Sequence, residues 1–90
     1  MNLLPRHLRI FLALAQSIKF SRIAEQFDVT QPALRKLVTD LEQALGVVLF
    51  ERSTRSIQLT AEGAKLLPVA GHLVDQYDGS LVVMQRFGDP

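Results

Sequence analysis

The chain has 90 residues and no cysteine, so it fits one small domain without disulfides or a thiolate metal site, and we expect it in the cytoplasm. With 48% hydrophobic residues it is expected to fold, and that share is high enough to suggest an apolar surface between subunits. The net charge of +1 hides an uneven distribution: residues 1–60 hold eight lysines and arginines against five acids, whereas residues 61–90 hold two against four. The first part therefore suits an anionic partner, and the alternative is that its charges are simply solvated.

Residues 5–17 are predicted to form an amphipathic helix. Its apolar side chains recur every three or four residues at Leu4, Leu8, Phe11, Leu12 and Ala15. The alternative is a signal peptide, because Arg6 and Arg9 precede an apolar run, but that run is only six residues long. The spacing favours the folded helix, and no stretch of the chain approaches the roughly 18 apolar residues of a membrane span.

Residues 22–27 are predicted to form a second, short helix with Ser21 as its N-cap. Its inner face would carry Ile23, Ala24 and Phe27. Asp28 and Val29 then make a tight connection to Thr30, which suits the N-cap of a third helix. Two helices joined so closely indicate a helix-turn-helix.

The third helix is predicted to run from the capping Thr30 to Gly46, a left-handed stop, with Pro32 in its first turn. One face is an apolar stripe, formed by Leu34, Val38, Leu41 and Leu45. The opposite face presents amide, guanidinium, ammonium and hydroxyl groups, on Gln31, Arg35, Lys36 and Thr39. A helix anchored on one side and polar on the other suits insertion into a DNA major groove.

The polar face has definite chemical options. Gln31 can pair with adenine or bond a phosphate, and Arg35, one turn further on, can read guanine or bind a phosphate. Lys36 is better suited to a phosphate. Each alone is also compatible with an ordinary solvated helix surface, but together, opposite a clear apolar stripe, they favour DNA.

Two short β-prone runs, 47–51 and 57–59, flank a polar turn and predict a small hairpin, the wing of a winged helix-turn-helix. Its tip carries two arginines and no acid, which suits the phosphate backbone or the minor groove. The predicted DNA contacts are therefore Ser21, Arg22, Thr30, Gln31, Pro32, Ala33, Arg35, Lys36, Thr39, Arg52 and Arg55.

Thr60 is predicted to cap a last helix of about 25 residues, which ends at residues 87–90. Pro68, Gly71 and Gly79 are expected to weaken this helix and to bend it. Its apolar residues follow a near-heptad spacing, with a second stripe alongside. Two stripes exceed what a domain of about 60 residues covers, so a partner helix is favoured over packing within the chain. The predicted dimer interface is Leu66, Ala70, Leu73, Val74, Tyr77, Leu81 and Met84.

Catalysis finds little support. His7 and His72 are isolated, the glycines form no phosphate-binding loop, and no nucleophile has a base nearby in a familiar motif. We expect no enzyme activity, no metal and no cofactor.

The elements in this order resemble the N-terminal DNA-binding domain of LysR-type transcriptional regulators, over about residues 3–85. The resemblance rests on Leu8-Arg-Ile-Phe11, Phe20-Ser-Arg-Ile-Ala24, Val29-Thr-Gln-Pro-Ala33, Leu41-Glu42, Leu45-Gly-Val-Val-Leu-Phe-Glu-Arg52 and Leu59-Thr-Ala-Glu-Gly63. It implies a mainly α fold: a winged helix-turn-helix of three helices and a hairpin over residues 1–60, then a long dimerising linker helix over 61–90.

The resemblance also implies a function, sequence-specific binding of double-stranded DNA by a homodimer on an inverted-repeat operator. Full-length members commonly form tetramers and carry a C-terminal effector domain that is absent from this chain, so we expect a fragment with no small-molecule effector site and no membrane partner. Position by position, Gln31 and Pro32 match the family's contact pair, Lys36 a phosphate contact, and Arg52 and Arg55 the wing arginines.

Three positions depart from the family pattern. Arg35 stands where a small hydroxyl residue is usual, which implies a different base preference or depth of insertion. Leu37 replaces a commonly polar residue and either touches a thymine methyl or widens the core stripe, and Ile18 replaces a small residue in the turn between the first two helices.

Two alternatives remain open at the level of sequence. One is the molybdate-responsive regulator, whose N-terminal domain is a similar winged helix. The other is a winged helix used for protein–protein assembly. The front of the third helix, which we expect to be basic and to lack acids, argues against this second alternative.

Overall fold

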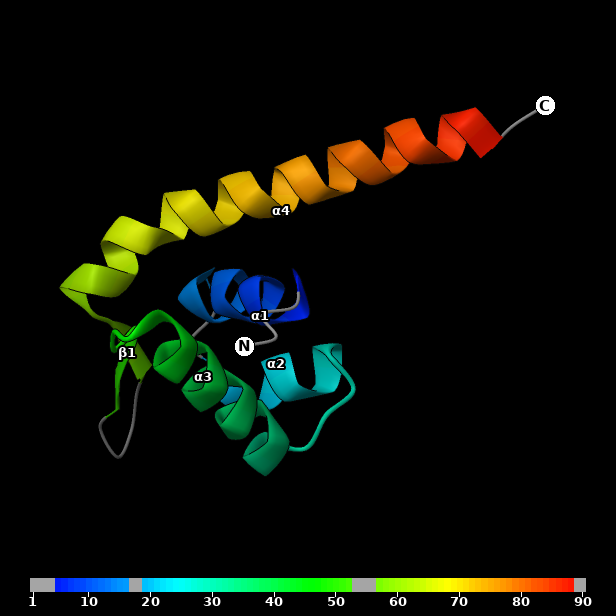
Figure 1. Ribbon diagram of the computed structural model, residues 1–90. Coiled ribbons are helices and arrows are strands. Elements are labelled where there is room, and N and C mark those ends of the chain that lie inside the picture. Colours follow the sequence, from blue (N-terminus) through cyan, green and yellow to red (C-terminus); the bar gives the residue numbers. More distant parts are fainter. Residues whose placement is uncertain (1–4, 17–18, 53–56, 89–90) are drawn as a thin grey trace.

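The structure is a computed structural model and describes residues 5–16, 19–52 and 57–88. Along the chain the elements are α1 (Pro5–Gln16), α2 (Phe20–Gln26), α3 (Gln31–Leu45), β1 (Phe50–Arg52), β2 (Ile57–Leu59) and α4 (Ala61–Gly88). The first three helices and the hairpin form a compact body, and α4 passes over α1 and extends beyond it (Figure 1). The predicted winged helix-turn-helix followed by a long helix is confirmed.

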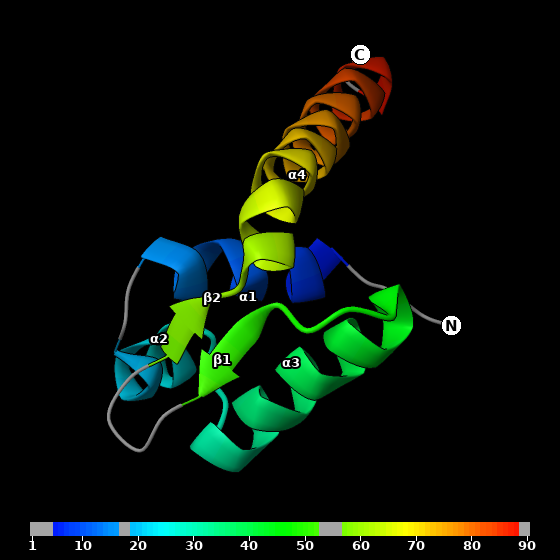
Figure 2. The same ribbon diagram turned by 90° about the vertical axis from the view of Figure 1, so that its left-hand side faces the viewer.

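The core lies where the inner faces of α1, α2 and α3 meet the start of the hairpin (Figure 2). Its least exposed large side chains are Ile10, Phe11, Leu34, Leu41 and Leu49. The rings of Phe11 and Phe50 meet edge to face, with centroids 5.7 Å apart, and so join α1 to β1. Because α1 supplies Ile10 and Phe11 to this core, it belongs to the folded domain, as its apolar spacing predicted.

The start of α2 differs from the prediction. The helix begins at Phe20, and Lys19 occupies the N-cap position without a side-chain capping bond, so the assignment of Ser21 as the N-cap is wrong. The carbonyl of Lys19 accepts the first-turn amides of Arg22 and Ile23 at 3.1 and 3.2 Å. Phe20 packs against the core, and the helix begins two residues earlier than the capping pattern suggested.

Asp28 makes the sharp turn between α2 and α3. Its φ is +56°, in the left-handed region, and its amide bonds the carbonyl of Glu25 at 3.0 Å while the next amide, of Val29, bonds Ala24 at 2.9 Å. This pair of bonds is the Schellman motif that closes many helices, here with aspartate in the position that glycine usually takes. Arg6 also donates to the Phe27 carbonyl at 3.1 Å, so α1 helps to satisfy the end of α2.

Replacing Asp28 with alanine is expected to destabilise the domain by about 1 kcal/mol, because a Cβ without a local polar group disfavours the left-handed conformation. Asp28→Gly should show no such loss, since glycine adopts this φ freely. Urea unfolding of the three proteins checks this, and an Asp28→Ala variant as stable as the parent would contradict it.

α3 follows the prediction closely. Thr30 caps it, its Oγ1 accepting the amide of Ala33 at 3.2 Å, and the predicted stripe of Leu34, Val38 and Leu41 is buried. Leu45, at the end of that stripe, is 39% exposed because the last turn projects past the body. Gly46 stops the helix at φ +72°, as predicted.

The hairpin is shorter than predicted. Strands β1 and β2 are antiparallel with Phe50 opposite Leu59 and Arg52 opposite Ile57, but residues 47–49 are not strand. The amide of Val47 still bonds the carbonyl of Glu42 at 3.2 Å, and the amide of Leu49 bonds the Glu42 carboxylate at 2.7 Å. These amides are held by α3, so they do not pair with the opposite strand. The predicted wing tip at 53–56 lies outside the described residues.

Thr60 immediately precedes α4, and its Oγ1 accepts the amide of Gly63 at 2.9 Å, which confirms the predicted cap. The helix spans 28 residues and runs through Pro68. Its first half packs on α1 and extends the core, and Ala70 is only 4% exposed. Where α4 leaves the body, Arg9 of α1 pairs with Asp78, and this hydrogen bond raises the pKa of the guanidinium above its ordinary value.

Candidate nucleic-acid interface

The outer face of α3 presents the polar residues that the sequence singled out. The side chains of Gln31, Pro32, Arg35, Lys36 and Thr39 are exposed, and Ala33 beneath them is half-buried. Leu34 on the opposite face is fully enclosed, so the rotation of the helix about its axis is determined by the core. Figure 2 shows α3 along the outside of the body, beside the hairpin. Because its back is anchored, α3 can enter a groove without rearrangement of the domain.

The neighbouring helix end adds to this face. Ser21 and Arg22 lie in the first turn of α2, and both side chains are exposed. Thr30 is exposed too, although its hydroxyl oxygen is already used in capping α3. The amides at helix N-termini point outward and favour anionic groups, so these residues could contact a phosphate backbone.

Arg35 is not simply extended into solvent. Its guanidinium carbon lies 5.5 Å from the centre of the Phe20 ring, so the cation rests over an aromatic face at the start of α2. The sequence did not predict this contact. It joins the two helices of the helix-turn-helix on the outer surface of the domain.

Lys36 forms an ion pair that corrects one expectation. Its Nζ lies 3.0 Å from Oδ2 of Asp40, one turn along α3, with both side chains substantially exposed. The expectation that the front of α3 lacks acids is therefore wrong, because residues four apart on a helix share a face. An exposed pair of this kind is weak, so the ammonium can exchange Asp40 for another anion.

Glu42 attaches the wing to α3. One of its carboxylate oxygens accepts the amide of Leu49 at 2.7 Å and that of Phe50 at 3.3 Å, so a side chain of α3 holds the strand at its start. The motif Leu41-Glu42 contained this residue, but no sequence pattern indicated its role. The predicted wing contacts fall beyond it: the side chain of Arg52 and the whole of Arg55 lie outside the described residues, as does Ile18.

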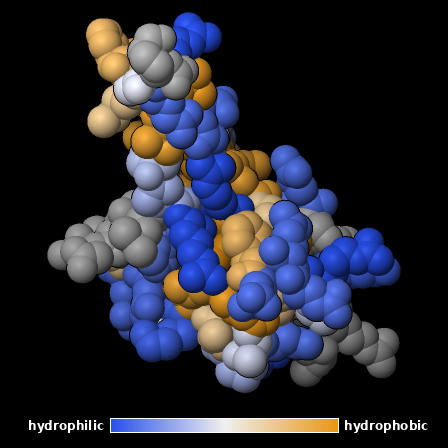
Figure 3. All heavy atoms as spheres, turned by 90° about the vertical axis from the view of Figure 1, so that its right-hand side faces the viewer, coloured by the Kyte–Doolittle hydropathy of each residue, from blue (hydrophilic) through white to orange (hydrophobic). Residues whose placement is uncertain are grey.

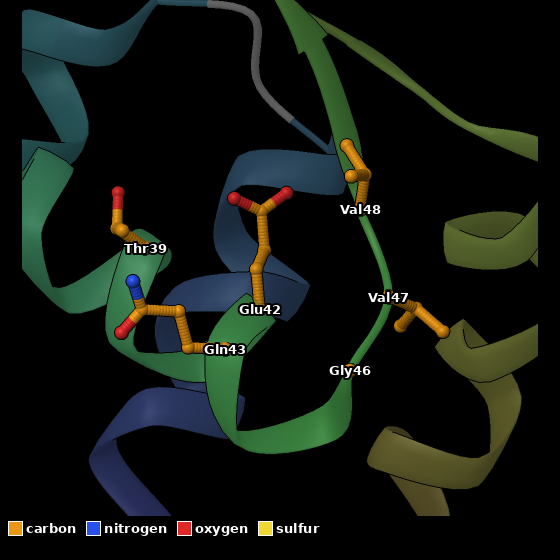
Figure 4. Close-up of a pocket in the computed structure, with 6 residues that line it drawn as sticks. All are labelled: Thr39, Glu42, Gln43, Gly46, Val47 and Val48. Atoms are coloured by element: carbon orange, nitrogen blue, oxygen red, sulfur yellow. The ribbon is translucent and has the colours of Figure 1, made fainter.

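A hollow of about 330 Å³ separates α3 from the chain that leads into β1, and is lined by Thr39, Glu42, Gln43, Gly46, Val47 and Val48 (Figure 4). Thr39 and Gln43 stand on the α3 side, with Val47 and Val48 across from them. The Glu42 carboxylate is engaged by the backbone amides of the strand, so this hollow offers no unpaired catalytic group. Its shape and position mark it as the junction between recognition helix and wing.

Within the described residues, no group of three or more histidine and acidic side chains is arranged to hold a metal ion. No helix there combines the length and the apolar character needed to cross a membrane. The features that stand out on the described surface are the polar front of α3, anchored from behind, and the hairpin beside it.

The predicted interface on α4 divides into two groups. Ala70 and Val74 are buried within the chain itself, at 4% and 7% exposure, because this face of α4 lies against the body. They are therefore not available to a partner as the sequence had suggested, and Leu66 is half-buried. The remaining predicted residues, Leu73, Tyr77, Leu81 and Met84, are exposed.

These elements define a winged helix-turn-helix domain of the DNA-binding class. The chain belongs to the LysR family of bacterial regulatory helix-turn-helix proteins, whose family model matches residues 5–64. The curated relatives that the chain matches are transcriptional regulators.

Curated relatives agree with this assignment. The chain is 44% identical over 80 residues to the transcriptional activator AmpR of Pseudomonas aeruginosa, covering 89% of this chain and 26% of that protein. It is 40% identical over 74 residues to the uncharacterised regulator YbhD of Escherichia coli, covering 82% and 23%. The chain thus spans about a quarter of the length of these relatives.

Solved structures of similar fold include complexes with DNA. The chain resembles DarR of Vibrio fischeri, solved in complex with DNA, with a TM-score of 0.91 and 33% identity over 98% of this chain and 30% of that one. It resembles the BenM DNA-binding domain in its catB site 1 DNA complex with a TM-score of 0.87 and 30% identity, over 98% and 99% of the two chains.

Proposed function

We propose that this chain is the DNA-binding part of a LysR-type transcriptional regulator that binds double-stranded DNA sequence-specifically as a homodimer. The observation that carries the proposal is the outer face of α3, polar and basic in front and locked to the core behind. We place α3 in the major groove, with Gln31 at its leading end and the wing against the flanking backbone or minor groove. In a longer protein this part would be joined to an effector domain and assemble further, to a tetramer.

Lys36 and Asp40 fit this mode of binding if the pair opens on the DNA. The ammonium, 3.0 Å from the carboxylate in the free protein, would transfer to a phosphate oxygen. The Asp40 carboxylate then stands without its partner near an anionic duplex. This disfavours binding wherever the DNA offers the carboxylate no hydrogen-bond donor. Asp40 would in this way lower affinity for unspecific sequences more than for the operator.

A homodimer is proposed through the part of α4 that stands clear of the body. Exposed apolar side chains follow this helix, at Val69, Leu73, Tyr77, Leu81, Val82, Val83, Met84 and Phe87 (Figure 3). Val69 and Phe87 extend the predicted set and lie on the same side of the helix as Leu73 and Met84. A second copy of α4 is the occupant proposed for this face, and a two-fold dimer would require an inverted repeat.

Leu73→Glu is expected to weaken the dimer at least about 100-fold, since a carboxylate would replace a large apolar group in the proposed interface. Sedimentation equilibrium should show monomer for this variant at concentrations where the parent is a dimer. His72→Glu, one residue away and also exposed, is the matched control and should leave the dimer intact. A parent chain that stays monomeric at millimolar concentration would refute the dimer.

The proposed function is tested by selecting duplexes from a random library and measuring affinity for the winner against random DNA as salt rises. We expect a two-fold symmetric motif and a steep salt dependence. A pure protein–protein assembly module would enrich no sequence and show no steep salt dependence, and this outcome would refute the proposal.

Two variants of α3 should lose affinity in different ways. Gln31→Ala should cost about 1–3 kcal/mol on the selected duplex and little on random DNA, because it removes a base contact. Lys36→Ala should weaken binding to all duplexes alike and reduce the salt slope by about one, because it removes a phosphate contact. Fluorescence anisotropy over a salt series separates these results, and equal losses for Gln31→Ala on both duplexes would demote that residue to a backbone contact.

A further inference from the structure

We propose that Phe20 is a positioning residue for Arg35, and that its ring holds the guanidinium ready to donate two parallel N–H bonds to DNA. This inference rests on the proposed function. The acceptor is a pair of neighbouring atoms, either guanine O6 and N7 or two phosphate oxygens, which present the same chemistry to an arginine.

The contact is built from both helices of the helix-turn-helix. Phe20 is the first residue of α2, where its ring is half-buried and packed against the core. Arg35 lies on α3, one turn after Gln31, and its guanidinium carbon is 5.5 Å from the ring centre. The ring is thus fixed by the core on one side and carries the cation on the other, so it limits where a long and flexible side chain can reach.

The donors of Arg35 remain open in this arrangement. No carboxylate, carbonyl or hydroxyl among the described residues accepts a hydrogen bond or ion pair from its guanidinium, in contrast to Lys36, which is paired with Asp40. A cation over an aromatic face is attracted by the quadrupole of the ring, and this attraction requires no N–H hydrogen bond and does not neutralise the charge. The guanidinium therefore keeps its donors for another partner while its motion is restricted.

Such restriction has a direct consequence for binding. Ordering a rotamer-rich side chain at an interface lowers affinity, and a side chain already ordered in the free protein avoids part of that loss. A small hydroxyl residue at position 35, as the family resemblance leads one to expect, would have no use for this arrangement. Arg35 and Phe20 together provide such an ordered side chain on the outer face.

The experiment is a double-mutant cycle on the whole chain with the duplex selected from the random library. Phe20→Leu is expected to weaken binding about threefold to tenfold, the range expected when one rotamer-rich side chain must be ordered on binding. In an Arg35→Ala background the same change should have no further effect. Phe20→Tyr, which keeps the aromatic face, should bind within about twofold of the parent.

Phe20→Leu removes packing as well as the ring, so a second series separates the two. Phenylalanines with increasing fluorine substitution, incorporated at position 20, keep the shape of the ring while weakening its negative face. Affinity should fall stepwise with fluorination when Arg35 is present and stay level when it is alanine. Thermal unfolding of each protein reports any loss of fold.

Several outcomes would overturn the inference. An equal loss from Phe20→Leu with and without Arg35, or affinity indifferent to fluorination, would assign Phe20 a packing role only. Tighter binding by Phe20→Leu would mean that the ring holds Arg35 away from DNA. Both results presuppose a parent that binds DNA, so a parent without salt-dependent binding refutes the proposed function instead.

The same proteins identify the acceptor. If Arg35→Ala removes the preference for one G·C pair of the selected site, the acceptor is guanine. If it weakens all duplexes alike and lowers the salt slope by about one, the acceptor is a phosphate. Either result supports the positioning role when the coupling to Phe20 is present.

Discussion

Gly63→Ala is expected to destabilise the domain by about 3 kcal/mol or more, because the added methyl group has no room. A Cβ at position 63 would overlap the carbonyl oxygen of Leu49 and would lie 2.8 Å from a methyl group of Leu59. The first of these is backbone and cannot turn aside. It also accepts the amide of Thr60 at 2.9 Å, so its displacement would break the bond that joins the start of α4 to the wing.

Thermal unfolding checks this directly, and for a domain of this size the loss corresponds to a fall in Tm of about 12 °C or more. Gly79→Ala is the matched control, because Gly79 lies in the same helix with nothing within 4 Å of its added Cβ. That variant should gain about 0.5–1 kcal/mol from better helix propensity. Equal effects at the two glycines would show that α4 does not approach Leu49 as closely as described.

The parts of this fold that follow from local chemistry could be predicted from the sequence. The cap at Thr30, the left-handed stop at Gly46 and the buried stripe of Leu34, Val38 and Leu41 depend on neighbours within a few residues, and all were found as expected. The polar front of α3 followed from the same helical period. A helix with a strong apolar stripe leaves little freedom in which side chains it exposes.

Contacts between distant segments could not be predicted in this way. Ala70 and Val74 fit the near-heptad spacing as well as Leu73 does, but only the packing of α4 on α1 decides that they are buried within the chain. Likewise Ser21 has the chemistry of an N-cap, yet the burial of Phe20 moves the start of α2. Periodicity identifies apolar faces, and tertiary packing decides which partner each face meets.

The candidate interface shows the same division. Gln31, Arg35 and Lys36 were recognised one by one from residue type and position, whereas their partners were not. Phe20 is 15 positions from Arg35 in sequence and meets it only because α2 and α3 cross. Asp40 differs from Phe20 in this respect, because it stands one turn after Lys36 and helical spacing alone places the two charges on one face.

Glu42→Leu is expected to lower the free energy of unfolding by about 3 kcal/mol and to weaken DNA binding through the wing. Its carboxylate accepts two backbone amides at the start of the hairpin, those of Leu49 and Phe50. Hydrogen bonds to a charged group contribute about 1.5–3 kcal/mol each, and amides left unpaired in a part-buried site add a desolvation cost. Glu42→Gln keeps an acceptor oxygen and should lose only about 1 kcal/mol. Urea unfolding measures both.

DNA affinity tests whether Glu42 positions the wing for binding. Once the measurements are made at a temperature where both variants are folded, Glu42→Leu should reduce affinity on the selected duplex and lower the salt slope, since the predicted wing contacts, Arg52 and Arg55, are no longer held against the backbone. Glu25→Leu, an exposed acid of α2, is the control, because it removes the same charge without touching the hairpin. If the two leucine variants unfold and bind alike, the carboxylate of Glu42 does not position the wing, and the strand must be held by its apolar contacts with the core alone.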